Sequence, residues 1–256
     1  MCERLNIKVE NIILVGAWEA AEIKGFLDAG ALRAYLFEAE PRAIDMLKQS
    51  YGTDLRVKIF EGAVSSQSGL TVKFNVLNHS SSSLYMPNME ELKKILPDFR
   101  VEKEIYVNTI TLDSTLDPYF KSWTGSKLGN LMILDIQGGE LEALRGAPEL
   151  LQEIGWIHSE VSTVELYQGQ NSLKQLDYFL KQNGFLRVSK RLYPKLNHGD
   201  ALYFRPNLIP SFFKSRILLE DIHWILAQKK PKWIPPLKTS FLGRLVLKLI
   251  YLQTHK

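Results

Sequence analysis

Short apolar runs alternate with helix-forming segments along most of the chain. The strand-like runs occupy residues 11–15, 33–37, 57–60, 131–134 and 156–158, and each is followed by glycine or a polar residue. Runs of this length and hydrophobicity are typical of strands that are buried on both faces. Helix-forming segments at residues 20–29, 41–47 and 140–145 lie between them. The alternation predicts an α/β fold with a doubly wound, mostly parallel sheet and helices on both faces.

Two further patterns interrupt and close this series. Residues 70–77 place Leu70, Val72, Phe74 and Val76 on one face, and residues 105–112 alternate likewise, which predicts two half-exposed strands. A helix is expected at residues 89–96, between them. An amphipathic helix at residues 171–182 and two short runs at 185–188 and 201–204 predict a C-terminal hairpin.

Composition narrows the class of protein. The chain has 256 residues, of which 45% are hydrophobic and 23% charged, as in a globular domain with an appendage. Cys2 is its only cysteine, so neither an intrachain disulfide nor a zinc-type cluster is expected. The start lacks the apolar core of a signal peptide and no apolar run reaches spanning length, so we expect a cytoplasmic protein.

The basic charge is concentrated at one end. Residues 207–256 carry nine Lys or Arg against Glu220 and Asp221, whereas residues 1–206 have a net charge of −3. We therefore divide the chain into a domain at 1–206, for which no nucleic-acid partner is expected, and a basic, partly amphipathic helical tail at 207–256. Arg244 and Lys248 lie on one face of its apolar segment. The tail could contact an anionic membrane surface or a partner, or pack on its own domain.

Four residues follow predicted strands and so are candidates for ligand contact. Gly16, Glu38, Asp135 and Glu160 each stand where a strand ends, and parallel sheets bind ligands outside these ends. Gly16 and Glu38 are separated by 22 residues. A glycine turn with an acid about 20 residues later is typical of ribose binding, in which the carboxylate accepts hydrogen bonds from two hydroxyls.

The loop after Gly16 disfavours a dinucleotide and hence a nicotinamide oxidoreductase. The Gly-x-Gly-x-x-Gly pattern needs glycines where this chain has Trp18 and Ala21. Glu19 and Glu22 would also repel a pyrophosphate, which requires bare backbone and a positive helix end. S-adenosylmethionine has no phosphate, and its cationic sulfonium and ammonium groups tolerate an acidic loop.

Several segments together carry a resemblance to a known family. They include Leu-Val-Gly-Ala at 14–17, Leu-Phe-Glu-Ala-Glu-Pro at 36–41, and Leu-Asp-Ile-Gln-Gly-Gly-Glu at 134–140 followed by Leu-Arg-Gly-Ala at 144–147. Shorter matches lie between and after these segments, at 61–65, 80–84, 111–113, 159–161, 166–169, 184–185 and 199–202. The set, which covers roughly residues 8–206, resembles the FkbM family of S-adenosylmethionine-dependent methyltransferases.

The resemblance implies a Rossmann-like methyltransferase fold and an S-adenosylmethionine-dependent O-methyltransferase. The acceptor would be a hydroxyl of a sugar, a glycan or a related natural product. Carried over by position, Gly16 and Ala17 line the methionine end of the cofactor and Glu38 holds the ribose. Gly62 and Ala63 lie near the adenine. Asp135 would face the sulfonium and the acceptor.

Three residues are candidates for the base that takes the hydroxyl proton. Asp135 is the first, with helix capping of the Gly138–Gly139 backbone as its structural alternative. Glu160 is the second, and its alternative is a solvated strand end. His79, in the polar loop that continues through the serines at 80–83, is the third; its alternative is a surface position. No metal is required by any of these roles.

One loop departs from the family pattern. The family's first loop usually has the pattern Gly-Ala-Asn-x-Gly, whereas residues 16–20 are Gly-Ala-Trp-Glu-Ala. Trp18 could block the methionine end or stack beside it, and Ala20 is strained if its φ angle is positive. A catalytically inactive domain that serves as a binding or scaffolding module is therefore the second hypothesis.

Overall fold

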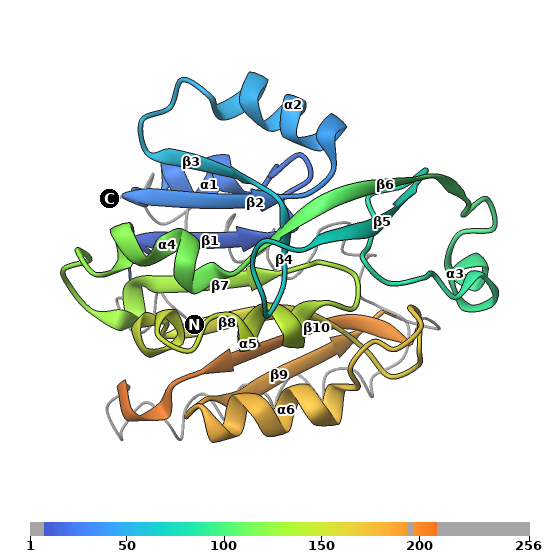
Figure 1. The fold of residues 1–256 in the computed structure, drawn as a ribbon. Coiled ribbons are helices and arrows are strands. Elements are labelled where there is room, and N and C mark those ends of the chain that lie inside the picture. Colours follow the sequence, from blue (N-terminus) through green and yellow to red (C-terminus); the bar gives the residue numbers. More distant parts are fainter. Residues whose placement is uncertain (1–7, 194–196, 209–256) are drawn as a thin grey trace, which may run out of the picture.

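A seven-stranded sheet forms the centre of the computed structural model, which describes residues 8–193 and 197–208 (Figure 1). Its order is β3-β2-β1-β7-β8-β10-β9. The strands are β1 (Asn11–Val15), β2 (Arg33–Glu38), β3 (Val57–Glu61), β7 (Asn130–Leu134), β8 (Trp156–Ser162), β9 (Leu186–Leu192) and β10 (His198–Phe204). The first five in this order run parallel, and β10 is antiparallel to both neighbours. The predicted α/β class, mostly parallel sheet and C-terminal hairpin are confirmed.

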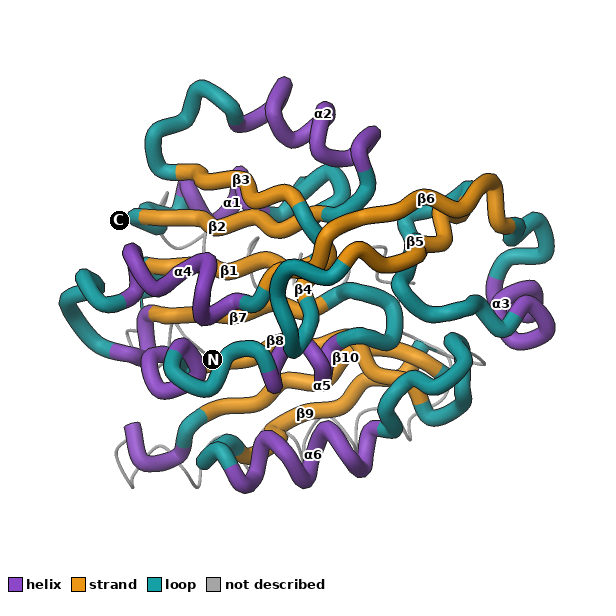
Figure 2. Tube along the Cα trace, viewed as in Figure 1, coloured by secondary structure: helices purple, strands orange, loops and turns teal. Residues whose placement is uncertain are grey.

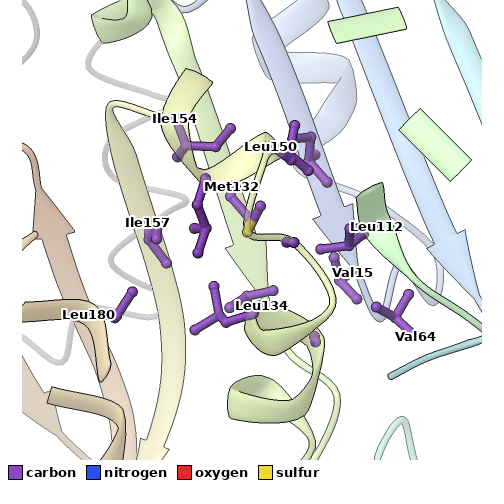
Figure 3. Packing of buried hydrophobic residues seen from close by; sticks show 14 of the residues in the cluster. Val15, Val64, Leu112, Met132, Leu134, Leu150, Ile154, Ile157 and Leu180 are labelled. Atoms are coloured by element: carbon purple, nitrogen blue, oxygen red, sulfur yellow. The ribbon is translucent and has the colours of Figure 1, made fainter. Parts of the chain in front are cut away.

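Helices cover both faces of this sheet. Helices α1 (Ile23–Asp28) and α2 (Pro41–Tyr51) pack on one face, against the residues of β1, β2 and β7 that point that way. Helices α4 (Leu112–Phe120), α5 (Glu140–Arg145) and α6 (Leu173–Gln182) pack on the other, with the 3₁₀ helix η3 (Leu150–Glu153). Figure 3 shows how Met132, Leu134 and Ile157 from the strands meet Leu112, Leu150 and Leu180 from the helices. Since both faces are covered, the strands are near-continuous apolar runs.

A smaller sheet projects from the body between β3 and β7. It has the order β4-β6-β5, from β4 (Ala63–Val64), β5 (Thr71–Leu77) and β6 (Val101–Ile110), and the short helix α3 (Met89–Ile95) lies at its far end (Figures 1 and 2). A satellite cluster of Leu77, Leu92 and Phe99 packs against Leu166 and Tyr167, which follow β8. This contact brings the loop after β5 back to the main sheet's strand ends.

Three local expectations need correction. The alternation at residues 70–77 holds only for the first half of β5, because residues 74–77 are all buried. Ser83 folds back to pair with Asn75, which covers the edge of β5 that β6 leaves free. The strand expected to end at residue 112 ends at Ile110, since Thr111 caps α4 by accepting a hydrogen bond from the Ser114 N–H. The helix expected from residue 20 begins only at Ile23, after a tight turn.

Residues 209–256 lie outside the described residues, and so does nearly all of the segment predicted as a basic helical tail. The helices in the part of the chain that the structure describes are all too short or too polar to cross a membrane.

Candidate functional site

The order in which the chain adds strands to the sheet reverses between β1 and β7, and the loops that follow these two strands separate there. From β1 the chain proceeds to β2 and β3 on one side, whereas β7 and β8 extend the sheet on the other. Open α/β sheets bind ligands at such a switch point, outside the carboxyl ends of the strands. A hollow of about 590 Å³, partly open to solvent, occurs at this place. We call it the switch-point hollow. Of the predicted cofactor residues, Gly16, Glu38, Gly62, Ala63 and Asp135 line it, but Ala17 is buried in the core beside α1.

Gly16 is the point at which the two loops approach most closely. Its φ angle is +81°, and a Cβ atom there would lie 1.9 Å from the carbonyl oxygen of Asp135. The Asp135 N–H also donates to the Val15 carbonyl at 2.9 Å. Only glycine allows the β1 loop to pass under the β7 loop at this distance, so Gly16 places Asp135 at the wall of the hollow.

Glu38 is a buried carboxylate at the end of β2, and it is 8% exposed. Its Oε1 accepts from the N–H groups of Ala39 and Glu40 at 2.7 and 2.8 Å, and its Oε2 accepts from the Trp18 N–H at 2.8 Å. Burial raises the pKa of Glu38 despite these three donors. A carboxylate has about four acceptor positions. In this conformation Glu38 therefore has room for one further hydroxyl, rather than the two that the sequence suggested.

The loop that departs from the family pattern is held in unusual backbone conformations. Trp18 and Ala20 have φ angles of +45° and +48°, which cost non-glycine residues about 1–2 kcal/mol each. The Tyr51 hydroxyl donates to the Ala20 carbonyl at 2.8 Å, and the Ala20 methyl packs in the core with Ile23. Ala20 thus retains the backbone shape that a glycine would adopt and adds a buried methyl. Trp18 lines the switch-point hollow.

The turn after β3 forms the facing wall. Gly62 has a φ angle of +145°, and its N–H donates to the Glu38 carbonyl at 2.8 Å. Ser80 and Ser82, from the loop that returns after β5, also line the hollow, and the Ser82 hydroxyl donates to Glu40 at 2.7 Å.

The segment from the end of β7 to the start of α5 holds three polar side chains with separate roles, Asp135, Gln137 and Glu140. Glu140 Oε1 accepts from the Ile136 and Gly138 N–H groups at 3.2 Å each, and burial raises its pKa to about 7. The capping role considered for Asp135 therefore belongs to Glu140, and α5 has no side-chain cap at Gly139. Asp135 is solvent-accessible through the hollow, although protein atoms crowd around it. That crowding raises its pKa to about 6.

Asp135 and Glu160 are brought together by Gln137. The Gln137 Nε2 lies 2.6 Å from Asp135 Oδ1 and 2.7 Å from Glu160 Oε2. Burial first, then the Asp135 and Glu140 charges, raise the pKa of Glu160 well above its usual value, so Glu160 is not a solvated strand end. Gln137 was not singled out by the sequence. Its place between Asp135 and the Gly138–Gly139 pair is the one signal that could have indicated it.

A second hollow, of about 440 Å³, lies on the other side of Gln137. Glu160, Tyr167 and Gln170 line it, together with apolar residues of α5 and α6. We call it the β8 hollow. Gln137 borders both hollows, so a change at this residue reaches both.

His79 is not among the residues that line either hollow. Its Nε2 lies 3.1 Å from Asp98 Oδ1, and its ring contacts Phe99 with centroids 5.0 Å apart. The structure thus places Asp135 and Glu160 together and His79 in a separate surface contact. Within residues 8–193 and 197–208, no group of three or more His, Cys, Asp or Glu is arranged to hold a metal ion.

Comparisons with known proteins give a consistent set of relatives. Residues 20–187 match the methyltransferase FkbM domain. The 2-O-methyltransferase NoeI of Sinorhizobium fredii (strain NBRC 101917 / NGR234) is 27% identical over 203 residues, which cover 76% of this chain and 79% of that protein.

Solved structures with a comparable arrangement include two bacterial proteins. One is SMU.1697c of Streptococcus mutans in complex with SAH, with a TM-score of 0.42, 10% identity, and coverage of 78% of this chain and 90% of that chain. The other is an rRNA methylase of Streptococcus thermophilus, with a TM-score of 0.39, 10% identity, and coverage of 77% and 87%.

Proposed function

Because the chain belongs to the FkbM methyltransferase family, we propose that it transfers the methyl group of S-adenosylmethionine to a hydroxyl oxygen of a sugar, glycan or related compound. Membership of the family makes the chain a methyltransferase. The cofactor and the acceptor atom are our proposal. The relative named as a 2-O-methyltransferase supports oxygen as the atom that is methylated.

The charge of the switch-point hollow is the observation that carries the cofactor proposal. Among the described residues that line it, none is Lys, Arg or His, and three are acidic: Glu38, Glu40 and Asp135. A pyrophosphate would find no positive partner among these side chains, whereas a sulfonium would find the Asp135 carboxylate; the Glu40 carboxylate is already paired with Arg42.

The residues fit an adenosyl ligand in position as well as in charge. Glu38 keeps one acceptor position for a ribose hydroxyl, beside the turn at Gly62 where a side chain is absent. Asp135 lies at the far end of β7, where the sulfonium would be attracted by its charge. When bound, S-adenosylmethionine supplies an electrophilic methyl group and a good leaving group, so positioning provides much of the acceleration.

The protein's chemical contribution is a base for the hydroxyl proton. Asp135 lines the switch-point hollow, and burial raises its pKa above the usual value, which makes it a better proton acceptor than an ordinary carboxylate. A positioned base of this kind contributes about 10²–10⁴-fold.

Calorimetry with the full chain tests the cofactor site. S-adenosylmethionine and S-adenosylhomocysteine should both bind, and Glu38→Gln should weaken binding by about tenfold or more. Glu61→Gln is the matched control, because Glu61 ends the next strand, is 55% exposed and pairs with Lys48 on the surface. Equal affinity of the two variants would remove Glu38 from the site.

Trp18 favours the rival function, a non-catalytic module, since its side chain lines the hollow where the methionine end would lie. The same calorimetry separates the two. Absence of binding in both the natural chain and a Trp18→Asn variant would reject the enzyme, whereas binding gained only in the variant would show that the indole ring blocks the site.

Transfer of a labelled methyl group to saccharides, with RNA and amines as comparison acceptors, tests the acceptor class.

A further inference from the structure

Gln137 is placed where a single amide contacts two carboxyl groups from different strands. Its Nε2 carries two hydrogens, and the distances of 2.6 and 2.7 Å assign one to Asp135 and one to Glu160. Asp135 follows β7 and Glu160 lies in β8, which pair in parallel. One side chain thus bridges the carboxyl ends of two neighbouring strands.

The orientation of this amide is fixed from several directions. The Tyr167 hydroxyl lies 2.9 Å from Gln137 Oε1 and donates either there or to the Ser81 carbonyl, which is equally close. The backbone of Gln137 is also held: the Ser83 hydroxyl donates to its main-chain carbonyl at 2.7 Å, and its φ angle is +57°. Rotating the amide by half a turn would set its oxygen against two carboxylate oxygens, so a reversed orientation is strongly disfavoured.

The surroundings of the two carboxyl groups are acidic. The charges of Glu22 before α1, Glu140 of α5 and Asp200 of β10 act on the pair, and Asp200 is the cross-strand neighbour of Glu160. Around Asp200 itself, the Tyr193 hydroxyl lies 3.1 Å from Oδ2 and His158 Nε2 lies 3.7 Å from Oδ1. Because the same amide nitrogen of Gln137 holds one oxygen of Asp135 and one of Glu160, the two carboxyl groups lie close to each other. Two adjacent carboxyl groups in such a field share one proton rather than both ionising.

We propose that Gln137 is a positioning residue that holds Asp135 and Glu160 as one proton-sharing pair, and that this pair is the base for the acceptor hydroxyl. The second part rests on the proposed function, and the first does not. In the transfer, the hydroxyl oxygen forms a bond to the methyl carbon as the carbon–sulfur bond breaks. The electron pair of the broken bond stays on sulfur. The hydroxyl proton passes to Asp135, which leaves both carboxyl groups protonated. The pair then releases one proton to water and is restored.

Titration of the labelled side chains tests the pair without any ligand. Carbon-13 NMR of the full chain should show Asp135 and Glu160 titrating together in two steps. Gln137→Met keeps the length of the side chain and removes both donors, so both steps should move to higher pH by about one unit, a tenfold change in proton affinity. Gln170→Met is the control, because the Gln170 amide binds only the Val164 carbonyl and the Tyr167 N–H. It should leave both steps in place.

A second variant gives a shift of opposite sign. In Glu160→Gln, Asp135 loses its like-charged neighbour, so its single titration should occur at lower pH than the second step of the natural protein. Independent titration of the two groups in the natural protein, or an unchanged titration in Gln137→Met, would overturn the proposal.

Binding of S-adenosylhomocysteine, measured in parallel, distinguishes the two failures. An unchanged titration with intact binding rejects the pair but leaves the methyltransferase. The expected shifts without binding leave the pair but reject its role as base.

Discussion

Replacement of Gly16 by alanine tests how much the close approach of the β1 and β7 loops contributes to the free energy of unfolding. Gly16 and Gly169 have nearly the same φ angle, +81° and +78°, but differ in the space around them. An added Cβ meets the Asp135 carbonyl oxygen at 1.9 Å in the first case and nothing within 4 Å in the second. Both substitutions incur the left-handed penalty of about 1–2 kcal/mol. Gly16→Ala adds overpacking of about 1–3 kcal/mol or more, because the obstacle is backbone.

Urea denaturation of the full chain measures this difference. Gly169→Ala should lower the free energy of unfolding slightly, since the loss of freedom in the unfolded chain offsets part of the strain by about 0.4–1 kcal/mol. Gly16→Ala should lower it by a clearly larger amount at unchanged m-value, and should weaken S-adenosylhomocysteine binding by displacing Asp135. Equal losses of stability in the two variants would show that the β1 and β7 loops separate freely, and would refute the reasoning from the 1.9 Å approach.

Three further outcomes are expected. Burial raises the pKa of Glu140 to about 7 from 4.5, so the folded state holds a proton that the unfolded chain has released. Stability should therefore fall as pH rises through that window, and Glu140→Gln should flatten the dependence measured by urea midpoints at several pH values; an identical slope in the variant would contradict it. Leu134→Ala, at a fully buried position, should cost about 2–5 kcal/mol, whereas Leu55→Ala at a 92% exposed position should change the unfolding free energy little; similar values would contradict the assigned core. Ser172→Ala removes the capping box of α6 and should cost about 1 kcal/mol in the same assay, and no loss would show that the cap is not needed.

Much of the fold could be predicted because its signals are local. Runs such as residues 131–134 are apolar throughout because both faces of the sheet are covered, and the sequence shows this directly. Parallel pairing then places the ends of β1, β2, β7 and β8 at one edge. Gly16, Glu38, Asp135 and Glu160 could therefore be grouped without any structure.

The remaining features depend on contacts between distant segments. Whether Glu38 keeps free acceptor positions is decided by the Trp18 N–H, which reaches it from another loop. The bridging role of Gln137 exists only because β8 brings Glu160 within 2.7 Å. Asp113 accepts from the Glu149 and Leu150 N–H groups and caps η3, at a separation along the chain that no local pattern encodes.

The position of β10 has a consequence for how the chain folds during synthesis. β10 is made after β9, yet it lies between β8 and β9, with seven residues paired to β8 from His198 to Phe204. While the ribosome has yet to release these residues, the outer edge of β8 keeps a row of unpaired N–H and carbonyl groups. β9 meanwhile has no neighbour to bind. The nascent protein therefore completes its sheet late, when β10 pairs with β8, and until then the unpaired edge of β8 is open to misassembly with a second copy.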